Sequence, residues 1–109
     1  MMNGQELSEL YAIIANRKIE PKEGSYTNYL FDKGLDKILK KVGEEATEVV
    51  IAAKNPDSEE VIYETADLLY HLLVLLVEKD IPYEAITAEL AKREGIVSKT
   101  TDRKEIENL

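Results

Sequence analysis

The segment from Val61 to Val77 is the most constraining part of the sequence, because it is apolar on almost every side of a helix. Its polar exceptions, Glu64, Asp67 and His71, are spaced so that they lie on one side. A helix that is apolar all round is expected to be buried, and a buried carboxylate is unfavourable unless something compensates it. The segment therefore predicts a helix packed inside a bundle, with its acidic stripe facing another element.

A second acidic cluster precedes this segment. Glu44, Glu45 and Glu48 share one face of a helix, and Lys41 and Lys37 fall on the same face one and two turns earlier. The opposite side carries an apolar stripe, which consists of Leu39, Val42, Ala46, Val49, Val50 and Ala53. We expect this helix to have a core face and a separate acidic face, and we expect the two acidic stripes to meet across the bundle.

Three kinds of compensation are open to these acids. Lysines could pair with them, the acids could stay neutral, or hard divalent cations could lie between them. Five carboxylates outnumber the two lysines on their face, which favours the cation. Oxygen ligands select magnesium, manganese or calcium over zinc or copper. A di-iron bundle is excluded on ligand count, because it needs Glu-x-x-His on two helices and the chain has one histidine.

The remaining pattern is also helical. Apolar spacing predicts a first helix over residues 5–17, and Pro21 and Gly24 indicate a loop after it. Ser25 or Thr27 is placed to cap a helix whose opening turns are residues 29–32. Gly34 marks a break or kink before a long helix over residues 35–54.

The second half continues in the same way. Asp57 and Glu60 form a capping-box pattern for a helix that runs to about Lys79. Pro82 suits the first turn of a helix through residue 93, with Gly95 at its end. The tail over residues 98–109 is polar, and no segment alternates with the period of a strand. The prediction is one all-α domain over residues 1–109, a helical bundle of four to five helices.

Composition excludes several classes of protein. The 14 basic residues against 22 acidic ones give a net charge of -8, which argues against binding nucleic acid or an anionic membrane. The absence of cysteine excludes disulfides, thiolate zinc sites and cysteine nucleophiles. The longest apolar run, residues 72–77, is far shorter than the roughly 20 residues that span a bilayer, and no secretory signal is seen. We expect a soluble, cytoplasmic protein.

Ordinary structural roles compete with function at each of these residues. The trio of glutamates also suits a solvated helix surface, whereas Glu64 and Asp67 have apolar neighbours that leave no obvious open face. His71 suits either a hydrogen-bonded core residue or a catalytic or substrate-binding one. Lysines before the acidic trio are solvated by default, but a site for phosphate and metal also needs them.

Three short sequence motifs carry a resemblance to a known family. They are Ser25-Tyr26-Thr27, the block KVGEEATEVVIAAKN over residues 41–55, and ETADLLYHLLVLL over residues 64–76. Their E-E-x-x-E and E-x-x-D patterns resemble the metal signature of the MazG-like all-α nucleoside triphosphate pyrophosphohydrolases. The similarity is closer to the phosphoribosyl-ATP pyrophosphohydrolases of histidine biosynthesis, and it covers roughly residues 7–94.

The resemblance implies an activity and a site. It implies hydrolysis of phosphoribosyl-ATP to phosphoribosyl-AMP and pyrophosphate, the second step of histidine biosynthesis. It implies magnesium, with manganese as a possible substitute, and one glutamate of the trio would orient or deprotonate the attacking water. The implied metal ligands are Glu44, Glu45, Glu48, Glu64 and Asp67. The implied substrate-binding residues are Ser25, Tyr26, Thr27, Lys37, Lys41, Lys54 and His71.

The resemblance also implies a homodimer or a larger homo-oligomer, in which helices of neighbouring subunits complete the site. Two alternatives stay open. One is a house-cleaning enzyme that hydrolyses dUTP, dCTP or damaged nucleotides at the same metal site. The other is a noncatalytic helical interaction module whose acids lie on its surface. The ending of the chain, GIVSKTTDRKEIENL, matches the family's usual basic tail only loosely.

Overall fold

The computed structural model describes residues 6–94, and these residues form five α-helices and no strand. The all-α prediction and the predicted number of helices are confirmed. Gly95 and the polar tail lie outside the described residues. None of the described helices is long and apolar enough to cross a membrane. The helices are α1 (Leu7–Ile19), α2 (Tyr26–Lys33), α3 (Leu35–Ala53), α4 (Ser58–Glu78) and α5 (Tyr83–Arg93).

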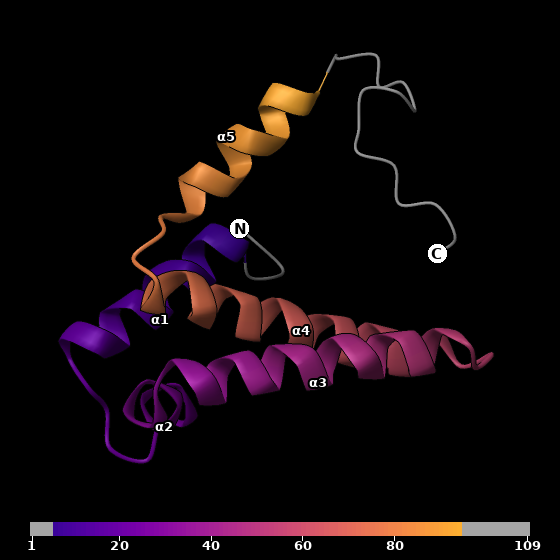
Figure 1. Ribbon diagram of the computed structural model, residues 1–109, viewed down its shortest axis with the longest axis horizontal. Helices are drawn as coiled ribbons and strands as arrows, with labels where there is room; N and C mark the ends of the chain where they lie inside the picture. The colour runs from indigo at the N-terminus through magenta and orange to yellow at the C-terminus, as the bar shows by residue number, and fades with distance from the viewer. Residues whose placement is uncertain (1–5, 95–109) are drawn as a thin grey trace.

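An antiparallel hairpin of α3 and α4 is the centre of the fold (Figure 1). A short loop over residues 54–57 joins the two helices. The helix α1 packs against α4, and α2 lies across the beginning of α3, whereas α5 leaves the end of α4 and extends away from the other four helices (Figure 1).

The buried core lies at one end of this hairpin. Ile14 of α1, Leu30 of α2, Ile38 of α3 and Val74 of α4 are at most 1% exposed and pack in one cluster with Leu73 and Val77. Each such side chain contributes about 1.5 to 3 kcal/mol of burial free energy. Because α3 and α4 are antiparallel, the acidic stripes lie two turns further along the hairpin, beside the core.

The first helices begin and end close to the predicted positions. The helix α1 extends two residues beyond its predicted end, and α2 begins at Tyr26, three residues before the predicted opening turns. Ser25 is the cap, since its hydroxyl oxygen accepts a hydrogen bond from the backbone N–H of Asn28 at 3.3 Å. The predicted break at Gly34 is confirmed, because this residue ends α2 and precedes α3 with φ of 95°.

The start of α4 is only partly as predicted. Asp57 is the N-cap, and its carboxylate accepts from the backbone N–H of Glu59 at 2.9 Å. The capping box with Glu60 is wrong, since the Glu60 carboxylate instead accepts from the side-chain amide of Asn55 at 3.2 Å. At the next helix, Pro82 is the N-cap of α5 and lies one position before the predicted first turn.

The predicted division of α3 into opposite apolar and acidic faces is wrong. Leu39 and Val50 of the predicted core stripe are 45% and 65% exposed. The buried residues of α3 are Ile38, Glu45 and Ala52, which recur every seven residues and point toward the rest of the bundle. Glu45 thus lies in the middle of the inward face, so the acidic site is built into the packing surface.

The prediction that α4 is buried on every side is also wrong for the single chain. Ile62 is 67% exposed, Tyr63 is 68% exposed and Leu69 is 39% exposed. The inward residues are those that face α1 and α3, and the opposite side of this long apolar helix is uncovered within residues 6–94.

Candidate metal and substrate site

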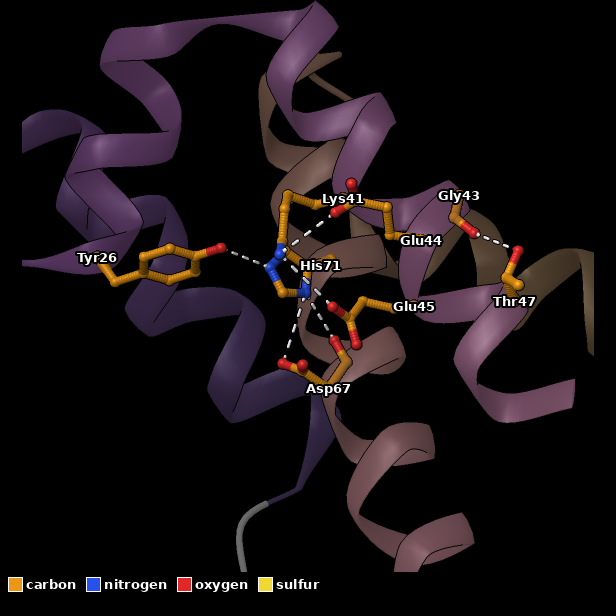
Figure 2. Close-up of polar contacts among 8 residues, drawn as sticks. All are labelled: Tyr26, Lys41, Gly43, Glu44, Glu45, Thr47, Asp67 and His71. Carbon is orange, nitrogen blue, oxygen red and sulfur yellow. Dashed lines mark hydrogen bonds and ion pairs between the residues drawn. The ribbon is translucent and has the colours of Figure 1, made fainter. Parts of the chain in front are cut away.

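Glu45 of α3 lies beside Asp67 and His71 in the acidic site (Figure 2). The residue is 4% exposed, and its Oε2 lies 3.6 Å from the Nζ of Lys41. Its Oε1 is buried and has no hydrogen-bond partner among the described residues. A carboxylate oxygen left in this state is unfavourable by itself, so the site has a place for a positively charged ligand.

Two sets of potential ligands share this carboxylate. In one, an oxygen from each of Glu45, Glu48 and Glu64 lies within 4.8 Å of the others. In the second set, ligand atoms of Glu45, Asp67 and His71 meet the same limit. The prediction that the two acidic stripes meet across the bundle is therefore confirmed, with α3 and α4 contributing to both sets.

The proximity of these acids changes their proton affinities. Burial, followed by the neighbouring carboxylates of Asp67, Glu48 and Glu64, raises the pKa of Glu45 from 4.5 to about 7. Burial and the charge of Glu48 also raise the pKa of Glu64. One lysine therefore does not offset the crowding of the acids, and the raised pKa favours the protonated form of Glu45 when no cation is bound.

The residues fit a hard divalent cation. Glu45 and Glu64 each have a buried Oε1 without a hydrogen-bond partner among the described residues. Carboxylate oxygens are the ligands that Mg²⁺ and Mn²⁺ accept, and opposite ligands of Mg²⁺ are about 4 Å apart, within the spacing found here. Glu44 belongs to neither ligand set, and its carboxylate pairs with Lys41 at 3.5 Å.

His71 lies between Tyr26 and the carboxylates (Figure 2). It is 2% exposed, its Nδ1 lies 2.8 Å from the backbone oxygen of Asp67, and its Nε2 lies 3.0 Å from the hydroxyl oxygen of Tyr26. A carbonyl oxygen accepts only, so the neutral ring carries its proton on Nδ1, and Nε2 accepts from the tyrosine hydroxyl. His71 therefore has both nitrogens engaged, as in the core-residue interpretation.

The three residues of the Ser25-Tyr26-Thr27 motif have different roles in the structure. Ser25 caps α2, as described above, and Tyr26 reaches His71. Thr27 forms a hydrogen bond between its hydroxyl and that of Tyr70 on α4. Tyr70 was not identified as a site residue from the sequence, although its position next to His71 on the helix that carries Glu64 and Asp67 was a signal. Of the three residues in this motif, Tyr26 is the exposed one, at 45%.

The predicted lysines do not gather at one point. Lys41 contacts two carboxylates of the site, and burial of its ammonium is outweighed by Tyr26, Glu44 and Glu45, so the pKa of Lys41 is raised. Lys37 instead lies 5.8 Å from the ring centre of Tyr29. Lys54 is exposed at the end of α3, six residues after Glu48 and so about 9 Å further along the helix axis.

An open groove gives solvent access to the acids. It has a volume of about 770 Å³, and its lining includes Glu44, Glu45 and Glu48. Lys40, one of the lysines before the acidic trio, also lines it, and so does Thr47, which was not identified as a site residue from the sequence. Thr47 follows Glu44 by three residues, and this helical spacing was the available signal. The groove is large enough to admit phosphate groups and water to the acidic face of α3.

Comparison with known proteins places these features in a family. The sequence profile described as phosphoribosyl-ATP pyrophosphohydrolase matches residues 7–94. A phosphoribosyl-ATP pyrophosphatase of Lactiplantibacillus plantarum is 65% identical over 105 residues, which is 96% of this chain and 99% of that protein. Proteins of the same name in Listeria innocua and Listeria monocytogenes are 72% and 71% identical over 103 residues, 94% of this chain and 99% of each relative. The chain therefore belongs to the phosphoribosyl-ATP pyrophosphohydrolase family.

Proposed function

We propose that this protein hydrolyses phosphoribosyl-ATP between its α and β phosphates and releases pyrophosphate and phosphoribosyl-AMP, the second step of histidine biosynthesis. The family assignment and the near-complete coverage of relatives named phosphoribosyl-ATP pyrophosphatase support this activity. The observation that carries it is Glu45, a buried carboxylate with one unpaired oxygen, set among the acids of two helices beside an open groove.

The proposed cofactor is Mg²⁺, with Mn²⁺ as a substitute. Glu45, Glu48, Glu64 and Asp67 would hold it, since Glu45 is shared by the two sets that contain the others. The Oε1 atoms of Glu45 and Glu64 have no other partner among the described residues. When bound, such a cation withdraws charge from the phosphate oxygens and so reduces their repulsion of an incoming nucleophile. The protein's own part is to place these oxygens before the substrate arrives.

Glu44 is our candidate for the residue that activates water. It lies outside both ligand sets, its side chain is 46% exposed, and it lines the same groove as Glu45 and Glu48. In the proposed step, a water oxygen forms a bond to phosphorus, the anhydride bond to the leaving phosphate breaks, and Glu44 orients the water and accepts its proton. This narrows the choice among the three glutamates to one.

Lys41 is our candidate for contact with the reacting phosphates. Its Nζ lies 3.5 Å from a Glu44 oxygen and 3.6 Å from a Glu45 oxygen, on the wall of the groove. An ammonium in this position stabilises charge on a phosphate oxygen and limits the repulsion between that phosphate and the acidic face. The net charge of -8 makes such local compensation necessary for an anionic substrate.

We further propose a homodimer or larger homo-oligomer that works in the cytoplasm, where its ATP-derived substrate is available. Large apolar residues are exposed on the outer sides of α3, α4 and α5, among them Val50 at 65%, Ile62 at 67% and Leu90 at 60%. Exposed apolar surface on this scale is typical of a protein-binding face. A second copy that covers α3 and α4 would also narrow the open groove at the acids.

The test is pyrophosphate release from phosphoribosyl-ATP, dUTP, dCTP and ATP, each with Mg²⁺ and with a chelator. We expect release from phosphoribosyl-ATP alone, and its loss on chelation. Release only from the other nucleotides would identify the protein as a house-cleaning nucleotide pyrophosphohydrolase. The absence of pyrophosphate release from all four substrates would favour a noncatalytic helical module.

A further inference from the structure

A pair of exposed tyrosines extends from the acidic site along α2. The ring centres of Tyr26 and Tyr29 lie 5.9 Å apart with an angle of 22° between the ring planes, and the residues are 45% and 41% exposed. Tyr70 also stacks on Tyr26, with ring centres 6.2 Å apart. Flat, exposed aromatic rings are the surfaces on which nucleic-acid bases stack.

The position of this stack is fixed at its inner end. The hydroxyl of Tyr26 donates to buried His71, which in turn donates to the backbone oxygen of Asp67. Figure 2 shows Tyr26 on one side of His71 and the acidic residues on the other. A depression of about 740 Å³ runs beside both tyrosines and includes Ser25 and Asn28. The inner tyrosine of the stack is therefore held in place next to the acidic site.

Two lysines lie at the outer end of the stack. The ammonium groups of Lys33 and Lys37 are each 5.8 Å from the ring centre of Tyr29. Within residues 6–94, neither lysine has a carboxylate within 4.0 Å, whereas Lys41 and Lys18 both form ion pairs. Two cations without carboxylate partners form an attractive site for a phosphate in a protein of net charge -8.

The separation of the lysines from the acids sets which phosphate they meet. Lys37 precedes Glu44 by seven residues of α3, which is about 10 Å along the helix axis. The substrate carries its reacting anhydride at one end and the phosphate of its phosphoribosyl group at the other, with the adenosine unit between them. The acids, the tyrosine stack and the two lysines follow one another in the same order.

We propose that Tyr26 and Tyr29 bind the adenine of the substrate, and that Lys33 and Lys37 bind the phosphoribosyl phosphate and so distinguish phosphoribosyl-ATP from ATP. This proposal rests on the proposed function and adds the specificity subsite to it. The reacting phosphates are left to Lys41 and the carboxylates. Because ATP lacks the phosphoribosyl group, it leaves the two lysines without their anion.

The test is equilibrium binding of phosphoribosyl-AMP and of AMP by titration calorimetry with Mg²⁺ present. It compares the wild type with Lys33→Gln/Lys37→Gln and with a control of equal charge, Lys79→Gln/Lys92→Gln, whose two lysines are exposed and outside the site. We expect the wild type and the control to bind phosphoribosyl-AMP at least about tenfold more tightly than AMP, and the Lys33/Lys37 variant to lose most of this preference while keeping its affinity for AMP.

Three results would overturn the subsite. They are a wild type without preference for phosphoribosyl-AMP, a Lys33/Lys37 variant that keeps the preference, and a variant that loses affinity for AMP to the same extent. Steady-state hydrolysis of phosphoribosyl-ATP separates this failure from failure of the proposed function. Turnover by the wild type with an unchanged KM in the Lys33/Lys37 variant contradicts the subsite alone, and no turnover by the wild type contradicts the function.

Discussion

The hydroxyl oxygen of Tyr26 lies 3.0 Å from Nε2 of His71, and this hydrogen bond joins α2 to the acidic helix α4. The ring of His71 is buried and also donates to the backbone oxygen of Asp67 at 2.8 Å. The two bonds run from an exposed tyrosine to the helix turn that carries a proposed metal ligand. The geometry of the substrate-facing surface and that of the acidic site are thus coupled through one imidazole.

Tyr26→Phe removes this hydroxyl and leaves the buried Nε2 of His71 without its donor. A buried polar atom that loses its partner costs about 1 to 3 kcal/mol, so we expect the free energy of unfolding to fall by that amount. Urea unfolding followed by far-ultraviolet circular dichroism measures it. The matched control is Tyr29→Phe, because Tyr29 is 41% exposed and shares the stack. Equal losses in the two variants would contradict the assigned role of the Tyr26 hydroxyl.

The raised pKa of Glu45 predicts how the stability of the metal-free protein depends on pH. Between the ordinary value of 4.5 and about 7, the folded state binds more protons at Glu45 than the unfolded state. The stability contributed by this group is therefore fully present below pH 4.5 and is lost as the pH rises toward 7. Glu45→Gln should remove this contribution, so the variant should gain stability relative to the wild type as the pH rises. The free energies of unfolding of the wild type and Glu45→Gln, measured with a chelator at pH 5 and pH 7.5, check the direction of this change.

Magnesium should make the wild type more stable than Glu45→Gln at pH 7.5. A cation that binds the folded state alone raises stability by about 2.7 kcal/mol at a hundredfold excess over its Kd. We expect Mg²⁺ to raise the melting temperature of the wild type beyond an equal ionic strength of sodium chloride, and Glu45→Gln or Asp67→Asn to abolish most of that rise. A shift of the same size in these variants would show that the ion binds elsewhere.

The different roles proposed for Glu44 and Glu48 predict different effects on kcat and on the thermal shift by Mg²⁺. Glu44→Gln should lower kcat by roughly 10² to 10⁴ while leaving the thermal shift by Mg²⁺ intact, because Glu44 is outside the ligand sets. Glu48→Gln should lower both, since the Glu48 carboxylate belongs to a set with Glu45 and Glu64. Full activity in Glu44→Gln, or a lost magnesium shift in that variant, would contradict its assignment as the water-activating residue.

Much of this architecture was predictable because it depends on local patterns. Helical spacing, the capping hydroxyl of Ser25 and the break at Gly34 are set by neighbouring residues, and all three are found in the structure. The meeting of the acidic stripes was also predictable, since Glu64 and Asp67 are the acids of an otherwise apolar stretch and needed a partner on another element.

What could not be predicted depends on how α3 is rotated against α4. Counting apolar residues placed Leu39 and Val50 in the core, yet packing turns Ile38, Glu45 and Ala52 inward. A buried glutamate has no hydrophobic signature, so its side of the helix is set by its partners on α4 and not by its own propensity. The contact of Lys37 with Tyr29 was not predictable for a different reason, because it depends on where α2 places Tyr29.

Two glycines of the same hairpin should respond to alanine in opposite directions. Gly34 has φ of 95° and ψ of -175°, a conformation that residues with a side chain avoid, whereas Gly43 lies within α3 with ordinary helical geometry. A Cβ at either position would meet no atom within 4 Å, so the difference arises in the backbone. Gly34→Ala should destabilise the fold by about 1 to 3 kcal/mol, and Gly43→Ala should stabilise it by up to about 1 kcal/mol. Urea unfolding of both variants measures the pair. Destabilisation by Gly43→Ala would contradict the open space around that residue, and an unchanged stability of Gly34→Ala would contradict the backbone strain expected there.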